Sequence, residues 1–130
     1  MDIIALTDHN SVFGNKQAIK VGNIHGIKVI PGIEFLHFFG AKVVLAHPTL
    51  LKCNIFNILI ELKFDGIEAK YYRNKENDTE RFIKAAKSKG IVYTAGSDFH
   101  SLGKLDTRHG TLGQVYLEGN EIKKFLCMLG

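Results

Sequence analysis

Short apolar runs alternate with amphipathic stretches along most of the chain. Continuous apolar runs of this length are typical of buried parallel strands. They cover residues 3–7, 28–33, 42–46 and 91–95. Further strands are expected over 67–72, after the turn at Asp65-Gly66, and over 114–117. Apolar residues recur at helical spacing over 14–23, 51–63, 78–89 and 121–129. This alternation predicts parallel βαβ units in an α/β fold.

Four of the apolar runs end in residue types that bind metal ions. The residues at these ends are Asp8 with His9, Glu34, His47, and Asp98 with His100. Functional groups of α/β folds collect at the carboxyl ends of parallel strands, so we expect these side chains to meet. In an extended chain Asp98 and His100 would also point to the same side. Any one of them could be a capping acid or a surface histidine, but repetition at four strand ends favours a divalent-metal site.

Composition is consistent with one compact domain spanning residues 1–130. The chain has 45% hydrophobic and 23% charged residues, enough for about one core. No apolar run reaches the ~18–20 residues that span a bilayer. The first residues also lack the basic lead of a secretory signal, so we expect no membrane association and a cytoplasmic location. Cys53 and Cys127 form no disulfide or Cys-x-x-Cys pattern, and we expect buried, inert thiols.

A formal charge of +4 favours phosphate-bearing substrates through long-range attraction. The basic residues are scattered along the chain, however, and no stripe of basic and aromatic residues accompanies them. We therefore expect a phosphate-bearing substrate, and nucleic acid only in the form of a nucleotide substrate.

Six motifs resemble, in order, those of the PHP (polymerase and histidinol phosphatase) domain, above all its small stand-alone phosphoesterases. They are Thr7-Asp8-His9-Asn10, Pro31-Gly32-Ile33-Glu34, His37-Phe38-Phe39-Gly40, Ala46-His47-Pro48, Asp65-Gly66-Ile67-Glu68 and Gly96-Ser97-Asp98-Phe99-His100. The resemblance implies a distorted (βα)7 barrel with two or three divalent cations (Mn, Zn or Fe) at the strand ends. It also implies hydrolysis of the phosphate monoester of a small metabolite or nucleotide by metal-activated water.

The resemblance also assigns roles to individual residues. The implied metal ligands are His9, Glu34, His37, His47, Asp98 and His100, with Glu34 as the bridging carboxylate. Asp8 would orient a ligand, and Asp8, His9 and His100 form the implied catalytic set. His37 could equally be a buried core histidine, because its spacing from Glu34 is shorter than in the family.

Loops that follow the later strands offer candidates for substrate binding. Arg73, Arg108 and His109 could contact a substrate phosphate, for which arginine offers bidentate geometry. The alternative for each of these residues is a solvated loop. Glu68 is either an acid at the rim of the site or a residue that simply begins a strand.

The chain also departs from the family pattern. It contains no His-x-His, and Met1-Asp2-Ile3 corresponds to the strand after that motif. The link between Glu34 and Lys42 is too short for a helical crossover. We therefore expect an N-terminally incomplete domain with a partial barrel, whose exposed sheet edges favour self-association. The alternative function is a catalytically inactive remnant that serves as a binding or structural module.

Overall fold

The computed structural model describes residues 2–7, 13–32, 42–52, 54–100 and 108–130. The predictions for Asp8, His9, Glu34 and His37 lie outside these residues. The chain divides into two compact units, Met1–Phe39 and Gly40–Gly130, each of which is described by itself. Among the described residues, no helix has both the length and the hydrophobicity that a bilayer crossing requires.

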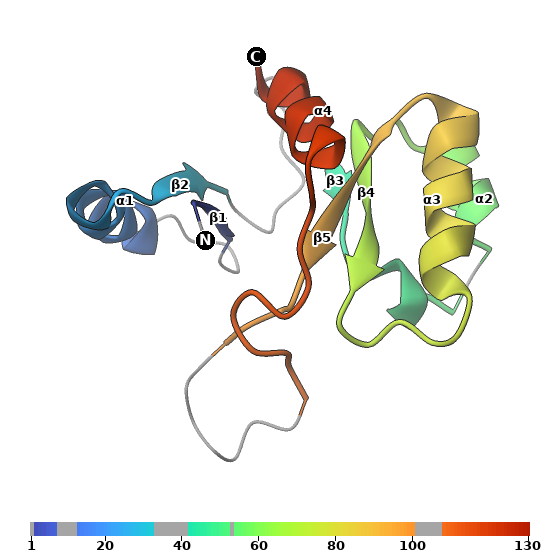
Figure 1. Ribbon diagram of the computed structural model, residues 1–130. Helices are drawn as coiled ribbons and strands as arrows, with labels where there is room; N and C mark the ends of the chain where they lie inside the picture. Colours follow the sequence, from blue (N-terminus) through green and yellow to red (C-terminus); the bar gives the residue numbers. More distant parts are fainter. Residues whose placement is uncertain (1, 8–12, 33–41, 53, 101–107) are drawn as a thin grey trace. The chain divides into compact units, whose positions relative to one another are not determined.

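The first unit is a parallel βαβ motif. It consists of β1 (Ile3–Leu6), α1 (Phe13–His25) and β2 (Lys28–Pro31), and β1 pairs with β2 in parallel (Figure 1). Gly26 has a φ of 69°, a left-handed conformation that ends α1 where the sequence predicts. Asn15 of α1 donates a hydrogen bond to the carbonyl of Gly32, 3.0 Å away, which ties the helix to the end of β2.

The second unit carries a three-stranded parallel sheet. Its elements are β3 (Val44–Leu45), the 3-10 helix η1 (Pro48–Leu50), α2 (Ile55–Glu61), β4 (Gly66–Tyr71), α3 (Asp78–Lys89), β5 (Val92–Gly96) and α4 (Asn120–Leu129). The strand order is β3-β4-β5, so β4 is the central strand. Both described sheets are open, which confirms parallel α/β architecture and shows no closed barrel within the described part of the chain.

The core of this unit lies between the sheet and the helices α2 and α3, which cover one face (Figure 1). Ile67 and Ala69 of β4 pack against Phe82 of α3, and all three are fully buried. The remaining buried members are Ile55, Leu59, Ala85 and Ala86. Glu121 at the start of α4 accepts hydrogen bonds from Lys70 of β4 (2.6 Å) and Tyr93 of β5 (2.8 Å), which anchors this last helix to the sheet.

Three local predictions are wrong in informative ways. The helix expected from residue 51 begins at Ile55, because Asn54 caps it by accepting a hydrogen bond from the backbone N–H of Phe56. Residues 114–117 form no strand, and the backbone N–H of Val115 donates instead to the Ser97 hydroxyl. Cys127 is exposed, because it lies on the outer face of the amphipathic α4. Cys53 lies outside the described residues.

Asp78, the first residue of α3, ties that helix to the segment that follows β3. Its Oδ2 accepts hydrogen bonds from the Thr49 hydroxyl (2.6 Å) and the Lys75 backbone N–H (3.0 Å). Its Oδ1 lies 3.1 Å from the guanidinium of Arg81. Because Thr49 belongs to η1, directly after His47, this acid holds the chain that carries one of the predicted ligands.

Acid should weaken the fold through Asp78. The Thr49 hydrogen bond, followed by that of Lys75, lowers the pKa of Asp78 from its ordinary value, although burial opposes the shift. The contribution of Asp78 to stability is therefore complete above the unfolded-state pKa and is lost as pH falls through the lowered folded-state pKa. We expect the urea midpoint of the protein to fall between about pH 5 and pH 3, and to fall less in Asp78→Asn.

Urea unfolding followed by circular dichroism at each pH measures this difference. Glu80→Gln is the matched control, because Glu80 lies in the same helical turn with a side chain that is 76% exposed. It should show the same pH dependence as the unaltered protein. Identical curves for Asp78→Asn and the unaltered protein would contradict the assignment.

Candidate metal centre

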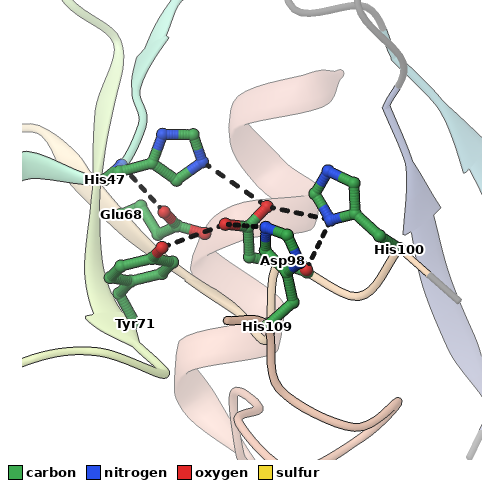
Figure 2. A network of polar contacts seen from close by, with 6 residues as sticks. All are labelled: His47, Glu68, Tyr71, Asp98, His100 and His109. Carbon is green, nitrogen blue, oxygen red and sulfur yellow. Dashed lines mark hydrogen bonds and ion pairs between the residues drawn. The ribbon is translucent and has the colours of Figure 1, made fainter. Parts of the chain in front are cut away.

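Three strands of the second unit deliver polar side chains to one edge of the sheet. His47 follows β3, Tyr71 ends β4, and Asp98 and His100 follow β5 (Figure 2). The structure thus brings together His47, Asp98 and His100, three of the ligands that the sequence predicts. They meet because parallel strands place their carboxyl ends at the same edge.

The Asp98 carboxylate is the centre of the cluster, and only 16% of its side chain is exposed. Its Oδ1 lies 3.8 Å from Nε2 of His47 and 3.7 Å from Nδ1 of His100. Its Oδ2 lies 4.0 Å from Nε2 of His109 and accepts a 2.9 Å hydrogen bond from the Tyr71 hydroxyl. Three imidazoles and one phenol therefore surround a single acid (Figure 2).

Two residues of the cluster have a backbone conformation that non-glycine residues seldom adopt. Within the described ranges, positive φ occurs at His47 (43°), Asn77 (67°) and Asp98 (53°) among non-glycine residues. Such conformations cost on the order of 1–3 kcal/mol and concentrate at functional sites. Two of these three positions, His47 and Asp98, belong to this one cluster.

The proximity of Asp98 and His100 does not arise as the sequence pattern suggested. β5 ends at Gly96, and the left-handed Asp98 turns the chain, so strand alternation does not operate between these residues. Instead, Nδ1 of His100 lies 2.8 Å from the carbonyl oxygen of Asp98. A carbonyl oxygen can only accept, so Nδ1 is the donor of this bond, and in the neutral tautomer that makes it the lone pair is on Nε2. Metal-binding histidines commonly have this arrangement.

His109 reaches the cluster through a return of the chain after β5. The Gly110 N–H donates to the Ser97 carbonyl (2.8 Å), and the Val115 N–H donates to the Ser97 hydroxyl (3.3 Å). Of these two bonds, that of Val115 uses backbone that the sequence pattern had assigned to a strand over 114–117. The returning segment places the His109 ring on the His100 ring, with centroids 3.8 Å apart and planes 24° apart.

Gly110 makes this return possible because it has no side chain. A Cβ at this position would lie 2.8 Å from the Ser97 carbonyl oxygen and 2.9 Å from the Tyr72 ring. Real Cβ atoms do not approach backbone and ring atoms so closely, so any larger residue would push the segment away. The position of His109 thus depends on its glycine neighbour.

β4 contributes two further side chains, Glu68 from its middle and Tyr71 from its carboxyl end. Glu68 Oε2 accepts a hydrogen bond from the backbone N–H of His47 (2.9 Å), which supports the left-handed turn there. Tyr71 packs against the His47 ring, with centroids 5.2 Å apart, and contacts Asp98. A register shift lies between Glu68 and Lys70, and shifts of this kind redirect the side chains that follow them.

Tyr71 is the participant that sequence reasoning missed. The signal was available, because Tyr71 stands near the carboxyl end of the strand expected over 67–72, whose neighbouring strands end in metal-binding residues. Burial raises the pKa of the Tyr71 phenol, and its hydrogen bond to Asp98 raises the pKa further. The hydroxyl is therefore a proton donor throughout the neutral range.

One group of donor atoms in the described part of the chain could hold a divalent cation. Asp98, His100 and His109 each offer one ligand atom, and these atoms lie within 4.8 Å of one another. Two ligands of one zinc ion, each about 2.0–2.2 Å from it, lie no more than about 4.4 Å apart. A small inward movement of the side chains would thus close the site. Imidazole and carboxylate ligands without thiolate suit Zn, Fe or Mn.

The predicted substrate-binding residues have separate positions. His109 belongs to the cluster itself, as a candidate ligand. Arg73 is exposed in the turn after β4 and is close enough to Tyr71 to lower its phenol pKa slightly. Arg108 is exposed beside His109. Both arginines thus flank the cluster, and their role in binding substrate stays a prediction.

Comparison of the chain with protein-family models, with curated proteins and with solved structures gave no match.

Proposed function

We propose that this chain is a metal-dependent phosphoesterase that hydrolyses the phosphate monoester of a small metabolite or nucleotide. The observation that carries the proposal is the Asp98 carboxylate, enclosed by His47, His100 and His109 at the carboxyl ends of parallel strands. The motifs resembling the PHP domain support the reaction class. The finer fold in this proposal is the distorted barrel that the resemblance implies.

In this proposal each side chain of the cluster has a role in binding the metal ion. Asp98, His100 and His109 would hold one cation. His47 is a fourth candidate ligand. It lies near Oδ1 of Asp98, whereas His109 lies near Oδ2. A bound divalent cation would supply Lewis acidity toward a phosphoryl oxygen and activate water at neutral pH. Any further cations implied by the family would involve His9, Glu34 and His37, which lie outside the described residues.

The protein offers positive charge beside the cluster for the substrate. Arg73 and Arg108 are exposed on loops next to Tyr71 and His109. A guanidinium binds a phosphate through two parallel hydrogen bonds, and its charge persists at all physiological pH values. These arginines would therefore orient the phosphate toward the cluster, while the net charge of +4 would attract the substrate from a distance.

Metal content and phosphatase activity test the proposal together. The chain is purified without chelators, and its Mn, Fe and Zn are measured by elemental analysis. Hydrolysis of p-nitrophenyl phosphate and of a panel of nucleoside monophosphates is then assayed with each metal. We expect at least one equivalent of metal, and activity that a chelator removes and the metal restores.

Two outcomes would count against this function. Hydrolysis that persists in a chelator after complete removal of the metal would contradict metal dependence. Tight metal binding without hydrolysis of any phosphate ester would favour the alternative, a binding module that retains part of the site.

A further inference from the structure

We propose that Tyr71 is a positioning residue that makes Asp98 a single-oxygen ligand, so that Oδ1 binds the cation and Oδ2 does not. This inference rests on the proposed function, because it assumes that the cluster binds a metal ion. It assigns a task to a side chain that no sequence motif marked.

The two oxygens of Asp98 have different surroundings. Oδ2 accepts a hydrogen bond from the Tyr71 hydroxyl at 2.9 Å, and the His109 nitrogen lies 4.0 Å from the same oxygen. Oδ1 faces Nε2 of His47 at 3.8 Å and Nδ1 of His100 at 3.7 Å. A cation shared by Asp98 and His47 would therefore meet Oδ1, while the phenol occupies a lone pair of Oδ2.

The Tyr71 side chain is fixed in position, so its hydroxyl can determine which oxygen of Asp98 binds the cation. It is 4% exposed, and its ring contacts the ring of His47, so the hydroxyl cannot turn toward solvent without breaking that packing. The same side chain thus positions both partners of the expected cation. A carboxylate oxygen that accepts a hydrogen bond from a buried donor is a poorer metal ligand than its neighbour, and outer partners of this kind orient the ligand.

The neighbouring strand supplies a matched control. Tyr93 of β5 is also partly buried and donates its hydroxyl to a carboxylate, that of Glu121, at 2.8 Å. Glu121 belongs to α4 and not to the cluster. Tyr93→Phe therefore removes the same phenol-to-carboxylate hydrogen bond from a site without a role in metal binding.

Titration with Co²⁺ tests the inference. We expect Tyr71→Phe to bind Co²⁺ about 10- to 100-fold more weakly than the unaltered chain, the usual effect of losing an outer partner. Its visible Co²⁺ spectrum should weaken in intensity, because a freed carboxylate that binds through both oxygens raises the coordination number. Tyr93→Phe should match the unaltered chain in affinity and spectrum.

Each of the other outcomes contradicts either the role of Tyr71 alone or the proposed function as well. If Tyr71→Phe keeps the affinity and the spectrum, or if both tyrosine variants lose affinity equally, the role of Tyr71 is wrong while the proposed function stands. If the unaltered chain binds no metal ion, both are wrong.

A second measurement avoids variants, in case Tyr71→Phe does not fold. X-ray absorption of the zinc-loaded, unaltered chain should show one carboxylate oxygen at about 2.0–2.2 Å. Two carboxylate oxygens from Asp98 at similar distances would overturn the inference.

Discussion

Asp98→Asn is expected to abolish cation binding at the cluster and, with it, phosphatase activity. Asp98 is the acid toward which His47, His100 and His109 converge, and the neutral amide cannot supply the negative charge that balances a divalent cation. The loss of affinity should exceed the roughly 10- to 100-fold cost of removing an outer partner. Calorimetric titration with Zn²⁺ or Mn²⁺, followed by a p-nitrophenyl phosphate assay, measures both effects.

Asp65→Asn is the matched control for this change. Asp65 precedes β4 and accepts hydrogen bonds from the backbone of Val43 (2.9 Å) and from Lys42 (3.4 Å). This acid joins two loops of the same unit without belonging to the cluster. Its variant should lose some stability and retain metal binding. Retention of full metal stoichiometry in Asp98→Asn would show that the cluster is not the binding site.

Gly110→Ala is expected to displace His109 and to weaken metal binding in a protein that still folds. The new Cβ would lie within 2.8 Å of the Ser97 carbonyl oxygen and 2.9 Å of the Tyr72 ring. Strain of this kind costs typically about 1–3 kcal/mol, and here it falls on the segment that stacks His109 against His100. Urea unfolding measures the loss of stability, and Co²⁺ titration measures the loss of affinity.

Gly14→Ala serves as the control for adding one methyl group. Gly14 lies in α1, and a Cβ there would meet Leu6 at an ordinary contact distance of 3.8 Å. Alanine is the better helix former, so this variant should be as stable as the unaltered chain or slightly more stable. Its metal binding should be unchanged. If Gly110→Ala binds metal normally, His109 is not a ligand.

The strands and helices could be predicted largely from the sequence, because periodicity reports which side chains are buried. The strand expected over 67–72 became β4, the central strand, and the helix expected over 78–89 became α3. Gly90 ends α3 in a left-handed conformation, with a φ of 66°, as its position after Lys89 indicates. These features depend on neighbouring residues alone, so local patterns suffice.

The wrong predictions fall where residues distant in sequence interact with the segment in question. Residues 114–117 have the composition of a strand, yet the N–H of Val115 donates to the side chain of Ser97, far from it in sequence. No local pattern carries that information. Cys127 likewise lies in an apolar helix, but whether it is buried depends on which face of α4 packs against the sheet.

The sequence by itself determined which residue types stand at the strand ends, and hence the chemistry that the cluster can perform. Parallel strands place the carboxyl ends that precede His47 and Asp98 at the same edge of the sheet. Only the tertiary structure decided that Asp98 is approached by His109 and Tyr71 and that His100 meets it through a left-handed turn. The physical reason is the distance along the sequence over which each kind of interaction acts. Strand and helix formation respond to neighbouring residues, whereas side-chain convergence depends on a register shift in β4 and on a glycine that admits the returning chain.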